Sequence, residues 1–323
     1  MEPQLDILTF HRIMPRGQRY FIPPMAMDES TFSKLIERLA LAKRLVSLDE
    51  GVLLLKNGKL QGSKVAISFD DGYRDNYTLA RKILQRIGVS ATFFVPVIPI
   101  DTETPYWWDH LYDVLLRNTE DFLNWGFARK SPHSVHHAFK TVNAARTCSL
   151  GERCRVLVQA LNALGETERN TFLLDFKQEF GPCAAEGLLM SWDDVRHLQR
   201  ESFSIGSHSV SHTPLTDLDR NNAHQEISES SELITLRIGK RPSGFCYPRG
   251  AYTPEHGRMV AEAGYDFAVT TDFGGNSTGA DPYTLKRRNM SDYRGIRAIS
   301  PVAMHLLELT GRFDALLATR RTA

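Results

Sequence analysis

The sequence predicts an α/β protein built around a parallel barrel, and three observations lead to that fold class. Apolar, β-branched stretches typical of strands alternate with stretches whose apolar residues recur at helical spacing, and this alternation is typical of a parallel sheet. About seven strand–helix repeats can be traced, which favours a barrel over an open sheet. The alternation is interrupted at residues 101–200, where the chain is predicted to be mostly helical.

The first half of the barrel begins with a strand and a well-marked helix. Residues 28–41 predict that helix, because apolar residues recur there at i, i+3, i+4 and i+7 and Asp28 or Ser30 can cap its start. Gly88 ends a second helix. The other elements expected here are strands at residues 5–10, 65–69 and 91–97 and a helix at residues 75–87.

The second half resumes the alternation after the helical block. Within the block, helices are expected at residues 107–117, 144–164, 168–180 and 191–201. After it, strands are expected at residues 203–207, 244–247 and 267–271, and helices at residues 222–238, 254–263 and 301–317. We therefore predict a single domain over residues 1–323, with residues 101–200 as a mainly helical insertion between two barrel strands.

Composition excludes several classes of protein. The chain of 323 residues is 42% hydrophobic and 24% charged, which is ordinary for a globular protein able to bury a sizeable core. Lys plus Arg number 39 and Asp plus Glu 38, so the formal charge of +1 does not indicate binding to nucleic acid or to an anionic membrane. The longest apolar runs are too short to span a bilayer.

The cysteines and the first residues favour a reducing compartment. Cys148, Cys154, Cys183 and Cys246 form no Cys-x-x-Cys pair, and a chain of this length needs no disulfide staples, so free thiols are expected. The first residues, Met-Glu-Pro-Gln-Leu-Asp, lack the basic start and apolar core of a signal peptide. A cytoplasmic location is therefore predicted.

Two adjacent carboxylates follow the expected strand at residues 65–69. Asp70 and Asp71 lie in the segment Ser-Phe-Asp-Asp-Gly, and the carboxyl ends of barrel strands are where active sites are built. Neighbouring carboxylates repel each other and are costly unless a cation or hydrogen bonds offset the charge. The alternative for this segment alone is an ordinary turn or helix start before Gly72.

A pair of histidines follows the strand at residues 203–207. His208 and His212 stand four residues apart in a loop rich in serine, and this spacing can bring both imidazoles to one metal ion. The alternative is two surface histidines in a polar turn. Together with Asp71 they make a complete ligand set for a catalytic zinc-type metal with one position open for water, which leaves Asp70 as a general base.

Three segments resemble the first three motifs of the polysaccharide deacetylases with a NodB-type domain, carbohydrate esterase family 4. They are Ser-Phe-Asp-Asp-Gly at residues 68–72, His-Ser-x-x-His at residues 208–212 and Phe-Cys-Tyr-Pro-Arg-Gly at residues 245–250. The resemblance runs from about residue 5 to about residue 288 and is weakest in the insertion. It implies a distorted, incomplete (β/α) barrel of about seven strands, in agreement with the alternation above.

The resemblance also implies roles for the motif residues. Asp70 is similar to the family's general base, and Asp71, His208 and His212 are similar to its three metal ligands. Arg249 stands where the family usually has a tyrosine whose backbone N–H helps to bind the oxyanion, and a change of side chain preserves that donor. The implied cofactor is a divalent metal, for which we predict zinc, with cobalt, nickel, iron or manganese as alternatives.

The sequence departs from the family pattern at two positions. Cys246 occupies the place of an arginine that steadies the base, and we predict that Arg287 does this instead. Arg288 is the neighbouring alternative. A further alternative is that both arginines belong to a basic, solvated strand end. The family's last motif supplies a histidine as general acid, and His305 is only a weak match to it. We predict His11, at the end of the first strand, as the acid; otherwise it is a core histidine.

These residues predict a metal-dependent hydrolase, acting on linear amides, that removes the N-acetyl group from an N-acetylhexosamine-containing glycan or glycan precursor of the exopolysaccharide or surface-polysaccharide type. The expected partner is that glycan, with no nucleic acid and no membrane span. One alternative is deacetylation of a lipid- or nucleotide-linked amino sugar. The other is a catalytically degenerate domain that binds glycan. The sequence does not specify the sugar, the linkage or the oligomeric state.

Overall fold

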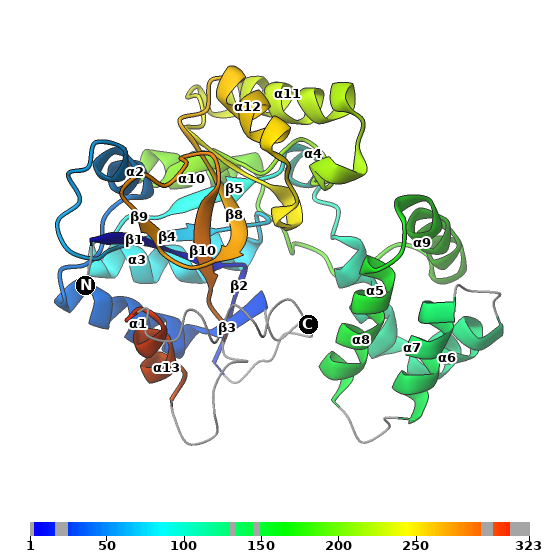
Figure 1. Cartoon of the computed structure of the whole chain (residues 1–323). Helices are drawn as coiled ribbons and strands as arrows, with labels where there is room; N and C mark the ends of the chain where they lie inside the picture. Colours follow the sequence, from blue (N-terminus) through cyan, green and yellow to red (C-terminus); the bar gives the residue numbers. More distant parts are fainter. Residues whose placement is uncertain (1–2, 17–24, 129–132, 145–148, 292–299, 311–323) are drawn as a thin grey trace. The chain divides into compact units, whose positions relative to one another are not determined.

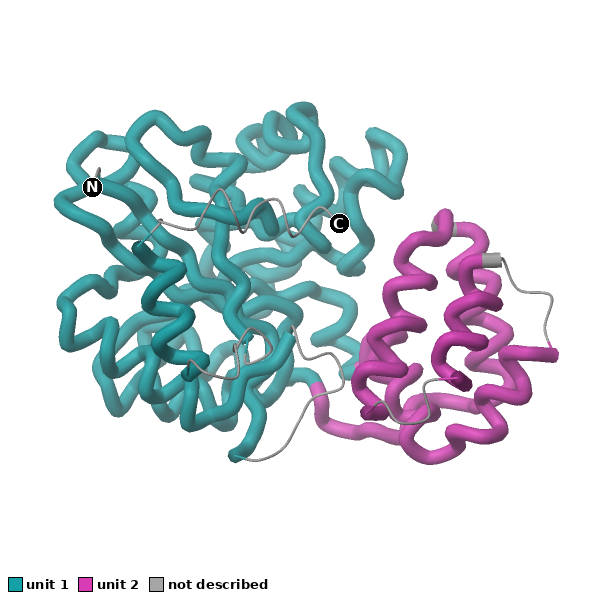
Figure 2. Tube along the Cα trace, turned by 60° about the horizontal axis from the view of Figure 1, so that its bottom comes forward, with its two compact units in different colours: residues 1–18, 24–103, 189–323 teal, residues 19–23, 104–188 magenta. Residues whose placement is uncertain are grey.

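The computed structural model describes residues 3–16, 25–128, 133–144, 149–291 and 300–310 (Figure 1). The chain divides into two compact units (Figure 2). One contains the described residues up to Glu103 and from Leu189 onward, and the other contains Thr104–Leu188. The helical unit is therefore shorter than the insertion expected at residues 101–200. That the chain acts as a single domain stays a prediction.

The first unit is a barrel whose parallel strands confirm the predicted fold class. In spatial order, the seven parallel strands of the barrel in the described part of the chain are β1 (Gln4–Phe10), β4 (Lys64–Phe69), β5 (Thr92–Val95), β6 (Ser204–Ser207), β7 (Gly244–Cys246), β8 (Phe267–Phe273) and β10 (Leu285–Asn289). The ring closes where β10 pairs with β1, with Leu8 opposite Arg288. A short strand, β9 (Asn276–Ser277), pairs antiparallel with β1. Two more, β2 (Arg12–Met14) and β3 (Ala26–Asp28), form a separate small sheet.

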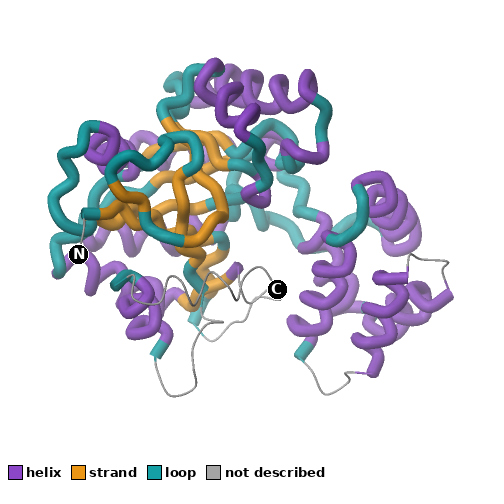
Figure 3. The backbone as a smooth tube through the Cα atoms, in the orientation of Figure 1, coloured by secondary structure: helices purple, strands orange, loops and turns teal. Residues whose placement is uncertain are grey.

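Helices surround the strands (Figure 3). In the barrel unit they are α1 (Glu29–Leu41), α2 (Leu48–Lys56), the π-helix η2 (Asn76–Ala80), α3 (Arg81–Ile87), α4 (Val97–Thr102), α10 (Trp192–Arg200), the 3₁₀-helices η3 (Leu215–Asp217) and η4 (Pro248–Gly250), α11 (Arg220–Ile238), α12 (Pro254–Glu262) and α13 (Pro301–Glu308). Among the described residues, no helix combines the length and the apolar character needed to cross a membrane.

The helix α1 shows how the sequence pattern produces this layer. Asp28 caps it by accepting a hydrogen bond from the Ser30 backbone N–H at 2.8 Å. Asp28 was one of the two caps that the sequence predicted, the other being Ser30. Its apolar stripe is buried against the outer face of β1 and β4, where the Phe32 ring meets the Phe10 ring edge-on at 5.0 Å. Burial of this stripe fixes the helix on the barrel.

The helix α2 lies at the amino-terminal end of the barrel. Its Leu48, Val52 and Leu55 pack in one cluster with Leu5 and Ile7 of β1 and with interior residues of other strands. Asp49, in the first turn of α2, also accepts hydrogen bonds from the hydroxyls of Ser204 and Ser243. Ser204 begins β6, and Ser243 immediately precedes β7. Because this end is filled, the opposite end, where the strands terminate, is left for a site.

The second unit is a helical bundle, in agreement with the mainly helical character predicted from the sequence. Its helices are α5 (Trp107–Arg117), α6 (Thr119–Ala128), α7 (His133–Ala144), α8 (Leu150–Asn162) and α9 (Glu166–Phe180). Its core is aromatic, with the Phe122, Phe139 and Phe176 side chains almost fully buried. The prediction missed α6 and α7 and began α8 too early, at residue 144; residues 145–148, including Cys148, lie outside the described residues.

Other boundaries also differ from expectation. The helix expected at residues 75–87 contains a π-helix, Asn76–Ala80, before the α-helix Arg81–Ile87. The last helix ends at Glu308, not at residue 317, although residues 311–317 lie outside the described residues. Cys154, Cys183 and Cys246 are free thiols, as expected.

Candidate active site

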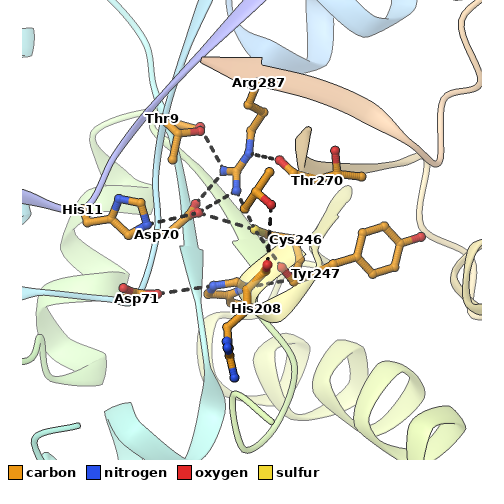
Figure 4. Close-up of polar contacts among 12 residues, drawn as sticks. Thr9, His11, Asp70, Asp71, His208, Cys246, Tyr247, Thr270 and Arg287 are labelled. Atoms are coloured by element: carbon orange, nitrogen blue, oxygen red, sulfur yellow. Dashed lines mark hydrogen bonds and ion pairs between the residues drawn. The ribbon is translucent and has the colours of Figure 1, made fainter. Parts of the chain in front are cut away.

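The adjacent carboxylates of Asp70 and Asp71 lie where β4 ends and face different partners (Figure 4). The Asp70 backbone N–H still donates to the Phe10 carbonyl oxygen at 3.0 Å, which continues the ladder with β1. Asp71 then adopts a left-handed conformation, with φ of 69°, and Gly72 follows with φ of 67°. This abrupt turn separates the two side chains, although their exposed fractions are only 2% and 4%.

Asp71 faces both predicted histidines. Its Oδ1 lies 3.3 Å from His208 Nε2 and 3.2 Å from His212 Nε2. His208 Nδ1 donates a hydrogen bond to the Cys246 carbonyl oxygen at 2.8 Å, so Nε2 is the ring nitrogen directed toward Asp71. The structure thus brings the three predicted ligands together at the ends of β4 and β6.

The spacing of these three atoms fits a metal ion. Ligands held about 2.0–2.1 Å from a tetrahedral zinc stand about 3.3–3.4 Å from one another. The separations of 3.3 and 3.2 Å between the Asp71 oxygen and the two imidazole nitrogens match that spacing. One carboxylate and two imidazoles are also a donor set that zinc accepts.

A second group of possible ligands overlaps the first. Asp70, His208 and Cys246 also have ligand atoms within 4.8 Å of one another. The Arg287 guanidinium, however, contacts both Asp70 and the Cys246 sulfur, so a fixed positive charge already lies against this group. Repulsion by that charge makes it the poorer cation site.

The loop between the histidines is a tight polar turn. Ser209 has φ of 67° and His212 has φ of 65°, both left-handed. The Ser209 hydroxyl accepts from the His212 backbone N–H at 3.0 Å, and the Ser207 hydroxyl accepts from the Ser209 N–H at 3.2 Å. Serine side chains replace the backbone partners that a helix would supply, which explains why the histidine spacing occurs without a helix.

Asp70 is held by a buried arginine of β10, the strand that pairs with β1 on the side away from β4. Arg287 Nη1 donates to Asp70 Oδ1 at 2.8 Å and Nη2 donates to Oδ2 at 2.7 Å, which is a bidentate pair. Arg287 Nε donates to the Thr270 carbonyl oxygen at 2.7 Å, which fixes the guanidinium plane. Arg288 points elsewhere and pairs with Asp6 at 2.8 Å, so the structure does not bring this alternative to the site.

These contacts set the charges of the site. Burial raises the pKa of Asp70, but the Arg287 charge and hydrogen bonds outweigh burial and leave that pKa below its usual value. The pKa of Asp71 lies well below its usual value because hydrogen bonds from the two histidines outweigh burial. Burial raises the pKa of the Cys246 thiol, so its sulfur, 3.6 Å from Asp70 Oδ2, stays neutral.

The two histidines respond differently to burial. Burial lowers the pKa of His212 below its usual value, which favours the neutral imidazole that a metal ligand must be. Burial also acts to lower the pKa of His208, but its contacts with Cys246 and Asp71 outweigh that effect and raise it. A metal ion would have to displace a proton from His208.

His11 and His305 occupy different environments. His11 follows β1, and its Nε2 lies 4.0 Å from Asp70 Oδ2, with the side chain 18% exposed. His305 is fully buried in α13, where its Nε2 donates to the Ser291 carbonyl oxygen at 3.0 Å and its Nδ1 lies 3.3 Å from Glu308. The weak match at His305 is therefore not part of the site.

Arg249 follows β7 at the same end of the barrel, with an exposed side chain. It adopts φ of 57°, and the next residue, Gly250, has φ of 68°. A Cβ atom on Gly250 would lie 1.9 Å from the Thr271 hydroxyl oxygen, so only glycine fits this turn. The turn thereby fixes the direction of the peptide that the family resemblance assigns to the oxyanion.

Sequence reasoning missed several residues that hold the site in place. Thr270 and Cys246 act through backbone carbonyl groups, which have no side-chain signature in a sequence. Asp75 accepts hydrogen bonds from Arg12 and from the Ile13 backbone N–H, so it ties the segment after His11 to the segment after Asp71. The Arg12 and Asp75 side chains are charged, but nothing in the sequence pairs residues so far apart.

A parallel barrel that gathers carboxylate and imidazole side chains at the carboxyl ends of its strands has the arrangement of barrel enzymes. The family model described as polysaccharide deacetylase matches residues 57–117 and 162–268, about half of the chain. The chain belongs to the polysaccharide deacetylase family. A curated relative, YxkH of Bacillus subtilis (strain 168), is 26% identical over 99 residues, which are 31% of this chain and 36% of YxkH.

Solved structures share the fold. The Streptococcus pyogenes deacetylase PplD, solved with acetate, has a TM-score of 0.59 at 14% identity, covering 96% of this chain and 99% of that one. The polysaccharide deacetylase BC0361 of Bacillus cereus has a TM-score of 0.59 at 15% identity, covering 95% and 69%. IcaB of Ammonifex degensii has a TM-score of 0.54 at 15% identity, covering 88% and 91%. At these identities the likeness concerns the fold alone.

Proposed function

We propose that this protein is a metal-dependent N-deacetylase that removes the acetyl group from an N-acetylhexosamine in a glycan or glycan precursor. The observation that carries the proposal is the division between the adjacent carboxylates: Asp71 faces two imidazoles, and Asp70 faces Arg287. One carboxylate is thus suited to bind a cation, and the other is kept ionised beside it. Membership of the polysaccharide deacetylase family supports the substrate class.

Asp71, His208 and His212 would hold the metal, and zinc suits their donor set, with cobalt, nickel, iron or manganese as alternatives. When bound, a divalent metal supplies Lewis acidity toward the acetamide carbonyl and lowers the pKa of water. The chain's own residues supply proton transfer, orientation and charge stabilisation.

Asp70 is the proposed general base. It takes a proton from the attacking water as the water oxygen bonds to the acetamide carbon. The bidentate contact with Arg287 fixes the carboxylate plane and, by lowering its pKa, keeps it able to accept a proton over a wide range of pH. A lower pKa also makes Asp70 a weaker base. The contact with Arg287 therefore keeps the carboxylate ionised and oriented at some cost in its affinity for the proton.

The remaining steps need an oxyanion donor and an acid. We assign the backbone N–H of Arg249 to the oxyanion, because the turn at Gly250 gives this peptide a fixed direction. His11, 4.0 Å from Asp70 and partly exposed, gives a proton to the sugar nitrogen as the C–N bond breaks and acetate leaves. Protonated Asp70 is the other donor within reach.

The proposal is tested by acetate release from a panel of N-acetylhexosamine oligomers and of lipid- and nucleotide-linked N-acetylhexosamines. Wild type should release acetate, and Asp70→Asn, which keeps the shape but cannot accept the proton, should lose activity by about 10²-fold or more. Asp193→Asn, at a carboxylate whose side chain is 88% exposed on α10, is the matched control and should remain active.

The substrates that respond decide between the candidate functions. Activity confined to the linked monosaccharides would assign the enzyme to glycan precursors. Metal binding by wild type, with no acetate from any substrate, would overturn the proposal in favour of a domain that binds glycan without turnover.

A further inference from the structure

The loop between the two histidine ligands is attached to a glutamate of a neighbouring helix. Glu226, on α11, accepts hydrogen bonds at its Oε2 from the backbone N–H groups of Val210 and Ser211, both at 2.9 Å. Such bonds to a carboxylate are charge-assisted and stronger than bonds between neutral groups. Consecutive backbone N–H groups directed at one anion form a nest, which holds the intervening peptides in a single conformation.

The opposite side of the loop is attached to α4. The backbone N–H of Val97 donates to the Ser209 carbonyl oxygen at 3.2 Å, and that of Ile98 donates to the Val210 carbonyl oxygen at 2.8 Å. The helices α4 and α11 also contact each other. The backbone N–H groups of the loop are therefore bonded to α11, and its carbonyl oxygens are bonded to α4. Of these contacts, the one made by the Glu226 side chain can be removed by a substitution.

The loop needs such a clamp because its conformation is strained. Ser209 and His212 both have positive φ, a conformation that is unfavourable for residues with a side chain unless surrounding contacts impose it. His212 must keep this backbone conformation for its Nε2 to lie 3.2 Å from the Asp71 oxygen. Ser211, one of the two residues bonded to Glu226, immediately precedes it.

We infer that Glu226 is a positioning residue for the metal centre. It holds the loop in the conformation that turns His212 and His208 together toward Asp71, and its negative charge favours a cation nearby. The inference rests on the proposed metal site, because it assigns Glu226 a function through two of the ligands. Glu226 touches neither substrate nor metal in this account.

The test measures zinc binding directly, on the full chain. Metal-free protein is titrated with zinc against a chromogenic chelator for wild type, Glu226→Ala, Glu226→Gln and Glu229→Ala. Glu229 is the matched control, because it is exposed and lies three residues further along the same helix. The unfolding temperature of each metal-free protein is recorded, with kcat and KM for acetate release at saturating zinc.

Glu226→Ala should weaken zinc binding by about 10- to 100-fold, the usual effect of removing a partner that orients metal ligands. Glu226→Gln keeps an acceptor oxygen and should recover part of that loss, whereas Glu229→Ala should bind like wild type. A merely structural role would lower the unfolding temperature of the metal-free protein and leave zinc affinity unchanged.

Zinc affinity of Glu226→Ala within about twofold of wild type would overturn the inference. If that variant does not fold, Glu226→Asp, which withdraws the carboxylate by one methylene, carries the same expectation and the same contrary result. Failure of the proposed function is recognised separately in wild type itself, which would then bind no divalent metal at this site or would bind it and release no acetate.

Discussion

At the scale of single residues, Asp70 is subject to two opposing effects. Burial favours its neutral form, and the Arg287 guanidinium, bonded to both carboxylate oxygens, favours its charged form and prevails. Arg287 itself is nearly fully buried, and its contacts with Asp70 raise its pKa despite burial, so it stays positively charged. The proposed base is therefore kept ionised by one specific partner.

Replacing that partner should shift the pH dependence of catalysis. In Arg287→Gln, burial is no longer opposed by a positive charge, so the pKa of Asp70 should rise and the acid limb of kcat/KM should move to higher pH. Activity at neutral pH should also fall, by about 10²-fold, because the base loses its orientation.

The pH profile of kcat/KM is the measurement for this substitution. Lys286→Gln is the control, because Lys286 is the exposed neighbour on β10 and should leave the profile unchanged. An acid limb at the wild-type position in Arg287→Gln would show that Arg287 does not set the pKa of the base.

At the scale of elements, the turn after β7 is limited by space as well as by backbone conformation. Gly250 has φ of 68°, and its missing Cβ would lie 1.9 Å from the Thr271 hydroxyl oxygen on β8. Gly239 ends α11 with φ of 72°, and a Cβ atom added to it would meet no neighbouring atom within 4 Å. The two glycines therefore separate the cost of a left-handed conformation from the cost of a collision.

Gly239→Ala should lower the free energy of unfolding by about 1 kcal/mol through backbone strain alone. Gly250→Ala should lower it by a further 1–3 kcal/mol or so, because β8 must move, and should also reduce kcat by redirecting the Arg249 peptide. Urea unfolding and acetate release measure both. Equal destabilisation by the two substitutions would mean that the turn can relax without effect on its neighbours.

Elements differ in how far the sequence could predict them. The helix α1 was predictable with its cap, because its apolar stripe and Asp28 are both local signals. The strands β2, β3 and β9 are two or three residues long, too short to show a period, and were missed. The π-helix η2 was predicted as ordinary helix because an inserted residue in a helical turn leaves no compositional mark.

At the scale of the whole molecule, the barrel order explains which parts of the site could be predicted. Residues at the carboxyl ends of β4 and β6 were expected to meet, because active sites of parallel barrels lie at that end. Arg287 could be named, but choosing it over Arg288 depends on which face of β10 points inward. Arg287 points toward Asp70, and Arg288 pairs with Asp6.

The contacts that hold the site depend on three-dimensional proximity alone. The Cys246 carbonyl oxygen that orients His208 and the Glu226 carboxylate that holds the histidine loop lie 38 and 16 residues from their partners. No period or motif in the sequence links such residues. The groups proposed to react could therefore be found from short motifs, whereas the residues that support them depend on the closed ring of strands and its helices.

In the proposed reaction, deacetylation depends on a metal held by Asp71, His208 and His212. The most direct measurement strips the purified protein of metal, restores zinc stepwise, and records bound zinc and acetate release together, for wild type and for His212→Ala. We predict that activity rises in proportion to one zinc per chain, and that His212→Ala neither retains zinc nor recovers. Full acetate release from the stripped protein, or zinc retained equally by His212→Ala, would contradict the account.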